Sequence, residues 1–179
     1  AAPGRYRLEV RRWPREEVAL EMQVSVDRTR SIAVPRFTDE GATVLAEGAE
    51  AAELAALVFD RAALGSALFL NGLSRKMLEL AVEYAKDRVQ FGRPIGSQQA
   101  VKHRLADALI ALEFAKPLAY RAAWSVAVAD PERSLHVSLA KLRASEAARF
   151  VAKQSLQVHG AIGYTIEHDL HLWMKRAWA

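Results

Sequence analysis

Residues Tyr84–Val101 have the sequence YAKDRVQFGRPIGSQQAV, which predicts a corner between two long helices. The helical pattern ahead of this segment stops in a charged turn, and Gly92, Pro94 and Gly96 follow it. Glycine and proline at this density break a helix. A second helix is expected to start at Ser97, because a serine hydroxyl accepts hydrogen bonds from the first turn. The segment therefore predicts two helices packed side by side and joined by a short connection.

The same corner places a cation close to an aromatic ring, since Arg88 and Phe91 are three residues apart. Arg forms charge-assisted hydrogen bonds with phosphate, and an aromatic face stacks on a flat heterocycle. The pair suits a ligand that contains both groups. The alternative interpretation is an exposed Arg on a loop and a Phe that fills the corner, and these residues alone leave both open.

Apolar and polar residues alternate over residues 5–46, which predicts three or four β-strands. The first, Arg5–Trp13, is expected to expose a charged face. Prolines at positions 3, 14 and 35 argue for edge strands or strand ends. So small a β-region is stable only when another element covers it.

From about Glu50 the hydrophobic period changes to 3.6, which predicts helices. Four are expected, at residues 50–87, from 97 to about 128, from about 131 to 158, and from 165 or 167 onward. Asp130 is expected to cap the third helix at its start, and Gly160 and Gly163 at its end. The predicted fold is mainly α: an up-down four-helix bundle preceded by a small partial β-domain. The expected core residues are Leu54, Leu57, Val58, Leu64, Leu68, Leu73, Met77, Leu80, Tyr84, Leu105, Ala108, Leu109, Leu112, Leu118 and Trp124.

Composition excludes several classes of function. Cysteine is absent, so there is no disulfide framework and no thiolate nucleophile. No apolar run approaches the roughly 18 residues that span a bilayer, and the N-terminus lacks the apolar core of a signal peptide, so we expect a cytoplasmic protein without membrane insertion. The net charge of +4 is concentrated in an N-terminal arm with five arginines. Glutamates interleave with them, which argues against nucleic-acid binding. The arm comprises Arg5, Arg7, Arg11, Arg12 and Arg15.

The corner resembles a sequence signature of the acyl-CoA dehydrogenase family, flavoenzymes that desaturate acyl-CoA thioesters. A second signature of that family follows in the same order: Gln157–Tyr164 has the sequence QVHGAIGY, and Glu167–Leu172 has EHDLHL. The resemblance covers roughly residues 24–178. It implies that residues 1–46 are the last part of the family's middle β-domain. Residues 47–179 are then the C-terminal four-helix bundle, which contacts flavin and forms oligomers.

The resemblance implies an FAD site at the corner. Arg88 matches the position whose guanidinium contacts the pyrophosphate of the cofactor, and Phe91 matches the aromatic residue beside it. Three further positions match residues that line the adenosine half: Gln90, Ile95 and Gln98.

A second strip of flavin contacts is implied at Gln157, Gly160 and Ala161, where small residues let the backbone approach the cofactor. Ala161 departs from the family pattern, which usually has a second glycine there. The alternative for Gln157 is a polar residue that caps its own helix end. In the family both strips reach the flavin of a neighbouring subunit, so the resemblance implies an oligomer, commonly a dimer of dimers.

No catalytic base is found. The family needs a carboxylate that removes the α-proton, and in one branch its position is Ala62, two residues after Asp60. In the other branch the Glu lies beyond the end of this sequence. Asp60 is interpreted as a helix-surface charge. The chain is therefore expected to be either part of a longer protein or a subunit that lacks its own catalytic Glu.

The function implied is α,β-desaturation of an acyl-CoA in fatty-acid or steroid side-chain degradation. The implied partners are the acyl-CoA substrate, an electron-transfer acceptor and a homologous dehydrogenase subunit that supplies the base. The alternative is a cofactor-free helical subunit that only supports assembly.

The acidic and histidine-rich segment around His168 and His171 is not expected to bind a metal, because no third ligand is fixed. His159 is interpreted as a packed or cofactor-adjacent imidazole. His103 and His136 are interpreted as ordinary helix residues.

Overall fold

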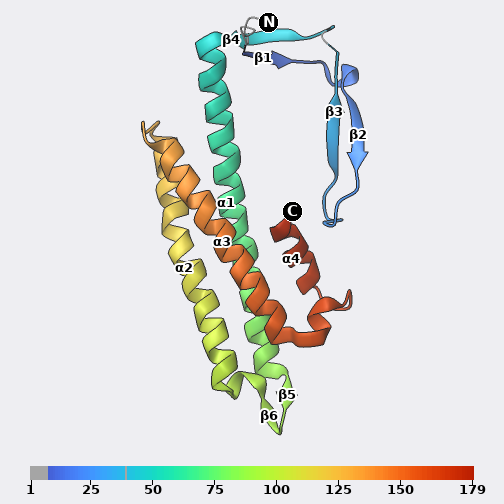
Figure 1. Cartoon of the computed structure of the whole chain (residues 1–179), viewed down its shortest axis with the longest axis vertical. Helices are drawn as coiled ribbons and strands as arrows, with labels where there is room; N and C mark the ends of the chain where they lie inside the picture. Colours follow the sequence, from blue (N-terminus) through green and yellow to red (C-terminus); the bar gives the residue numbers. More distant parts are fainter. Residues whose placement is uncertain (1–7, 39) are drawn as a thin grey trace, which may run out of the picture. The chain divides into compact units, whose positions relative to one another are not determined.

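The computed structural model describes residues 8–38 and 40–179, which form two compact units (Figure 1). The first unit ends at Arg61, and the second is Ala62–Ala179. The predicted first strand falls partly outside the described residues, as do the first two arginines of the basic arm. These undescribed positions include Pro3, Arg5, Tyr6 and Arg7.

The first unit contains two antiparallel strand pairs. Strand β1 (Glu9–Arg12) pairs with β4 (Thr43–Glu47), and β2 (Ala19–Gln23) pairs with β3 (Ile32–Arg36). The 3₁₀ turn η1 (Arg15–Glu17) separates β1 from β2. All five residues of β2 are exposed, because a two-stranded ladder has no second layer to cover its apolar side chains. Four strands in the described part of this region agree with the prediction of three or four.

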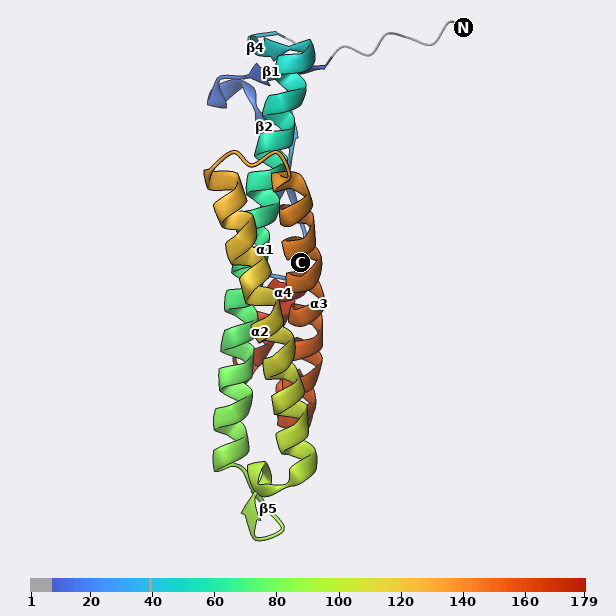
Figure 2. The same ribbon diagram turned by 90° about the vertical axis from the view of Figure 1, so that its left-hand side faces the viewer.

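Four α-helices follow in the described residues: α1 (Gly48–Asp87), α2 (Gln99–Ala127), α3 (Arg133–His159) and the nine-residue α4 (Leu170–Trp178). Figure 2 shows α2 and α3 side by side with the C-terminal part of α1. Helix α4 packs on the same core through Leu170 and Met174. The predicted mainly α fold with four helices is confirmed, although the fourth is short.

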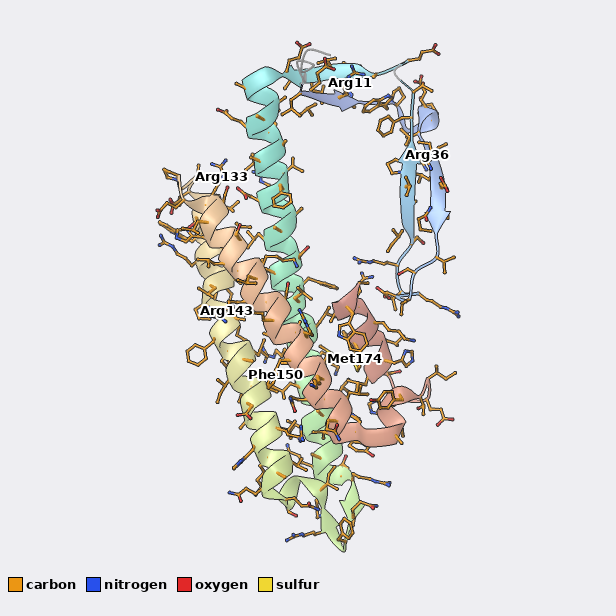
Figure 3. The ribbon with its side chains drawn as sticks, viewed as in Figure 1. Arg11, Arg36, Arg133, Arg143, Phe150 and Met174 are labelled. Atoms are coloured by element: carbon orange, nitrogen blue, oxygen red, sulfur yellow. The ribbon has the colours of Figure 1, made fainter. Side chains whose placement is uncertain are left out.

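Small side chains dominate the contact between α2 and α3. Alanine lets helix axes approach closely, and it loses no side-chain entropy in a helix. Larger residues fill the rest of the core, among them Met77 and Leu112. Met174 of α4 also belongs to this core (Figure 3). The buried alanines are Ala108, Ala115, Ala119 and Ala122 on α2, and Ala140, Ala144, Ala147, Ala148 and Ala152 on α3.

Several large residues predicted to face the core are exposed instead. On α2, Leu109 is 46% and Trp124 is 52% exposed. Helices α2 and α3 both carry apolar residues on more than one face, so the hydrophobic periodicity alone did not identify the buried face. On α1 the wrongly assigned residues are Leu54, Val58 and Leu68.

The predicted helix starts also need correction. Gln98, not Ser97, is the N-cap of α2, and the Ser97 hydroxyl donates to the Pro94 carbonyl oxygen at 2.7 Å. Helix α3 begins at Arg133, because the Asp130 carboxylate accepts from the Glu132 backbone N–H (2.9 Å) in a turn ahead of the helix.

Two further assignments concern the end of α3. Gly160 is its C-cap, as predicted, with φ of 63°. Gly163 instead belongs to the following 3₁₀ turn, η3 (Gly160–Tyr164).

Helix α4 begins at Leu170, later than predicted. Within the described residues, no helix combines the length and the apolar character needed to cross a membrane.

Candidate cofactor site

The corner after α1 is a short β-hairpin that presents an exposed aromatic ring. Strand β5 (Val89–Gln90) pairs with β6 (Arg93–Pro94), and the loop is Phe91-Gly92. Both loop residues have positive φ, 54° and 76°, as in a type I′ turn. The left-handed region disfavours a bulky L-residue, and the Phe91 side chain is 91% exposed. Phe91 therefore does not fill the corner, and packing of its side chain does not offset the cost of its left-handed backbone.

Arg88 combines a fixed backbone with a free side chain. Its N–H donates to the Tyr84 carbonyl oxygen at 2.9 Å, and its own carbonyl accepts from the Ile95 N–H at 2.8 Å. Its side chain is exposed, and in the part of the chain that the structure describes it has no hydrogen-bond or ion-pair partner. The guanidinium group is therefore available to an anion.

The three residues predicted to line the adenosine half differ in exposure. Gln90 is exposed, and its amide donates to the Val89 carbonyl oxygen at 2.8 Å. Gln98 is half-buried at the start of α2. Ile95, also half-buried, lies in the 3₁₀ turn η2 (Ile95–Ser97) and packs on a small apolar cluster. That cluster is formed by Ala81, Ala85 and Val158.

The second predicted strip lies at the end of α3. Gln157 is exposed, and its side chain makes no hydrogen bond within the described residues, so it does not cap its own helix. The Gly160 N–H donates to the Leu156 carbonyl oxygen. A Cβ at Gly160 would meet nothing within 4 Å, so this glycine is required by its φ and not by lack of space. Ala161 is exposed beside it.

The structure brings the two strips together at one end of the bundle (Figure 1). Ile95 from the first strip packs on the apolar cluster that contains Val158, the residue next to Gln157 of the second strip. The Tyr84 ring stacks on the His159 ring, with centroids 4.6 Å apart and an interplanar angle of 23°. Sequence reasoning missed this stack, because residues 75 positions apart give no joint signal without a fold.

Ala62, where the resemblance places the catalytic base of one branch of the family, lies far from this end. Ala62 is exposed, and at about 1.5 Å per residue the helix carries it roughly 38 Å from Asp87. Asp60 is only 4% exposed, and the residue has an interaction partner. Its interpretation as a surface charge is therefore wrong. A buried carboxylate is tolerated when it is paired, and its sequence position does not reveal such a partner.

The remaining histidines have other roles. His136 Nδ1 lies 2.8 Å from the hydroxyl of fully buried Ser125, and Asp130 completes this network at the connection of α2 to α3. His168 and His171 do not share a helix, since α4 starts between them. Within residues 8–38 and 40–179, no three His, Asp or Glu side chains are grouped so as to hold a metal ion.

The groups at this end of the bundle fit a dinucleotide. A free guanidinium suits a phosphate, an exposed ring suits a heterocycle, and a glycine with positive φ leaves backbone accessible. Behind these groups lies buried His159, whose ring nitrogen Nε2 has no hydrogen-bond partner in the described residues.

Comparisons with known proteins give the family. The family model described as acyl-CoA dehydrogenase, C-terminal domain, matches residues 47–179. The chain is 38% identical over 169 residues to acyl-CoA dehydrogenase IpdE2 of Mycobacterium tuberculosis, which covers 94% of this chain and 48% of that protein. It thus spans about half the length of such curated relatives.

Solved structures agree with this result. The ChsE4–ChsE5 complex from Mycobacterium tuberculosis matches with a TM-score of 0.77 and 29% identity, over 90% of this chain and 43% of that chain. A variant of the steroid ACAD Tcur3481–Tcur3483 matches with a TM-score of 0.78 and 26% identity, over 90% and 43%. With the family model covering its whole helical part, the chain belongs to the acyl-CoA dehydrogenase family.

Proposed function

We propose that this chain belongs to an FAD-dependent acyl-CoA dehydrogenase, an oxidoreductase that introduces an α,β double bond into an acyl-CoA, and contributes the helical domain of that enzyme. One observation carries the proposal: Arg88, with no partner in the described residues, and exposed, strained Phe91 lie three residues apart at the corner after α1. A bundle needs neither for its packing. Strain at an exposed residue is tolerated where the residue serves a ligand.

The residues assigned to FAD are those of the two strips. Arg88 would bind the pyrophosphate, and Phe91 would lie against the cofactor beside it. When bound, FAD accepts the hydride from the β-carbon of the acyl group. The chain's own residues bind and orient the cofactor. Besides those two, the proposed contacts are Gln90, Ile95, Gln98, Gln157, Gly160 and Ala161.

We further propose that the chain assembles with a homologous dehydrogenase subunit. Large apolar side chains lie exposed on α2 and α3 while alanines fill the core between these helices, an arrangement typical of subunit interfaces. The first solved structure above is described as a complex of ChsE4 with ChsE5, and the description of the second joins two names, Tcur3481 and Tcur3483. A partner would also supply the Glu that is absent at Ala62. The exposed residues include Leu109, Phe114, Tyr120, Trp124, Leu135, Leu139 and Leu142.

The proposed substrate and domain boundary rest on the similar proteins and on the family model. A steroid side-chain or fatty acyl-CoA is proposed as substrate, since one structural neighbour is described as a steroid ACAD. We place the domain boundary between residues 46 and 47, because the family model begins at 47 and α1 at Gly48. An electron-transfer acceptor and a cytoplasmic location complete the proposal.

The test uses the full-length protein and Arg88→Ala. Loss of a charge-assisted pyrophosphate contact should weaken FAD binding by about 10- to 100-fold, measured by flavin fluorescence titration. The melting temperature of the apoprotein should not change, because the guanidinium has no partner in the described residues. Arg143→Ala is the matched control, since Arg143 is exposed on α3 and pairs with Glu146 (Figure 3).

One observation favours a second candidate, a cofactor-free subunit that supports a catalytic partner: the base position is Ala62. Purification alone and with a homologous partner separates the two. If neither preparation holds flavin and Arg88→Ala changes nothing, the supporting subunit is correct and the FAD assignment is wrong.

A further inference from the structure

Three aromatic side chains from three parts of the second unit form one ring cluster. Tyr84 lies near the end of α1, His159 is the last residue of α3, and His168 lies in the segment before α4. The His159 ring stacks on Tyr84 and meets His168 edge-on, with centroids 4.5 Å apart. The Tyr84 and His168 centroids are 6.2 Å apart. The cluster therefore ties together segments that no continuous helix connects.

The surroundings of His159 favour its neutral form. Nδ1 lies 2.7 Å from the Ser155 carbonyl oxygen, to which it donates, and Nε2 is buried with no partner among the described residues. Protonation would place a second N–H at Nε2 with no acceptor in the described residues. Burial lowers the pKa of His159 below its usual 6.5, His168 lowers it further, and the Ser155 hydrogen bond opposes both.

The titratable groups that face His159 are those whose rings contact it. They are Tyr84 from α1 and His168 from the segment before α4; Nδ1 of His168 accepts from the Leu170 N–H at 3.1 Å, so its own proton lies on Nε2. Protonation of His159 would place a positive charge against the His168 ring, whose centroid lies 4.5 Å away, and a second N–H that has no acceptor in the described residues. Acidification is therefore expected to separate the rings.

The cluster lies between the two strips of proposed FAD contacts. The Tyr84 carbonyl accepts from the Arg88 N–H, so the stacked residue is one helical turn from the guanidinium. His159 precedes Gly160 directly. Any rotation of α1 against α3 at this stack would change the distance between Arg88 and Gly160.

We infer that His159, in its neutral form and stacked on Tyr84, is a positioning residue that sets the β5–β6 hairpin against the end of α3 and thereby the two halves of the cofactor site. This inference rests on the proposed FAD contacts. His159 acts through Arg88, Phe91 and Gly160.

The experiment uses full-length protein with FAD as the probe, and the variants His159→Ala and His159→Phe. His159→Ala removes the stack and should weaken FAD binding by about tenfold, the effect of losing one aromatic pair. His159→Phe keeps a ring that cannot be protonated. Because the pKa of His159 lies below its usual 6.5, wild-type protein should release FAD only as the pH falls below 6.5, and His159→Phe should release less. The matched control is His103→Phe, since His103 is exposed on α2.

A second readout needs no cofactor. In the apoprotein, His159→Ala should increase amide hydrogen exchange over residues 84–98, because the hairpin loses its tie to α3, while His103→Phe should not. Should His159→Ala fail to fold, Tyr84→Leu removes the same stack from the other side.

The outcomes separate the inference from the proposed function. Unchanged exchange over 84–98 in folded His159→Ala or Tyr84→Leu, or a wild-type pH profile in His159→Phe, overturns the positioning role. If exchange rises but wild-type protein binds no FAD, the ring cluster still orders the hairpin, the cofactor assignment fails, and the link between the two is overturned.

Discussion

Replacing Phe91 by Asn should stabilise the chain while weakening its binding of FAD. Phe91 is the first loop residue of the β5–β6 hairpin and has φ of 54°, and Gly92 follows with φ of 76°. Asn-Gly is the preferred pair for two positive φ angles, because Asn tolerates the left-handed region. The substitution therefore relaxes the loop without altering its length.

The expected change in the free energy of unfolding follows from two opposing contributions, the lost burial of the ring and the relief of backbone strain. The Phe91 side chain is 91% exposed, so about 20 Å² of the roughly 200 Å² that a packed Phe buries is covered. At about 25 cal/mol per Å² this burial contributes about 0.5 kcal/mol. Left-handed backbone costs a non-glycine residue about 1–2 kcal/mol. Relief of strain exceeds the lost burial, and the net gain is about 1 kcal/mol.

Thermal unfolding of the apoprotein and FAD titration measure the two effects. For a domain of this size 1 kcal/mol corresponds to an increase in Tm of about 2–4 °C, whereas FAD binding should weaken by about three- to tenfold through loss of the ring. Phe91→Ala is the control, since it removes the ring but keeps the strain. A Phe91→Asn protein destabilised by more than about 1 kcal/mol, or one with unchanged FAD affinity, would refute the reasoning.

Two further substitutions test the local structure. Gly96→Ala should destabilise by about 1–3 kcal/mol, because a Cβ there would lie 2.8 Å from the backbone oxygen of Ala85, and urea unfolding measures the loss. Asp130→Asn tests acid sensitivity: the backbone N–H of Glu132 holds the pKa of Asp130 below its usual 3.8, with Ser125, His136 and Arg121 contributing. Its stabilisation is complete above pH 3.8 and is lost as the pH falls through the folded-state pKa. The difference in urea midpoint between wild type and Asp130→Asn should therefore shrink on acidification below pH 3.8, and a difference that grows would contradict the assignment.

Much of the helical layout was predictable from local signals. The breakers after Asp87 and the change of period near Glu50 placed the first helix end and start within a few residues of those observed. Helix starts were less accurate, because Ser97 and Asp130 bind nearby backbone groups in turns ahead of the helices. The candidate site residues came from family resemblance, and their exposure and partners came from the fold.

The sequence by itself determined the helices, their breaks and the family, because these depend on local propensity, periodicity and short motifs. Only the tertiary structure decided which helix face is buried, since Trp124 and Ala122 are both apolar and packing alone selects the alanine. It also decided that Asp60 is buried and that Tyr84 meets His159. Such contacts join residues that are distant in the chain, and their energies arise only when the helices pack against one another.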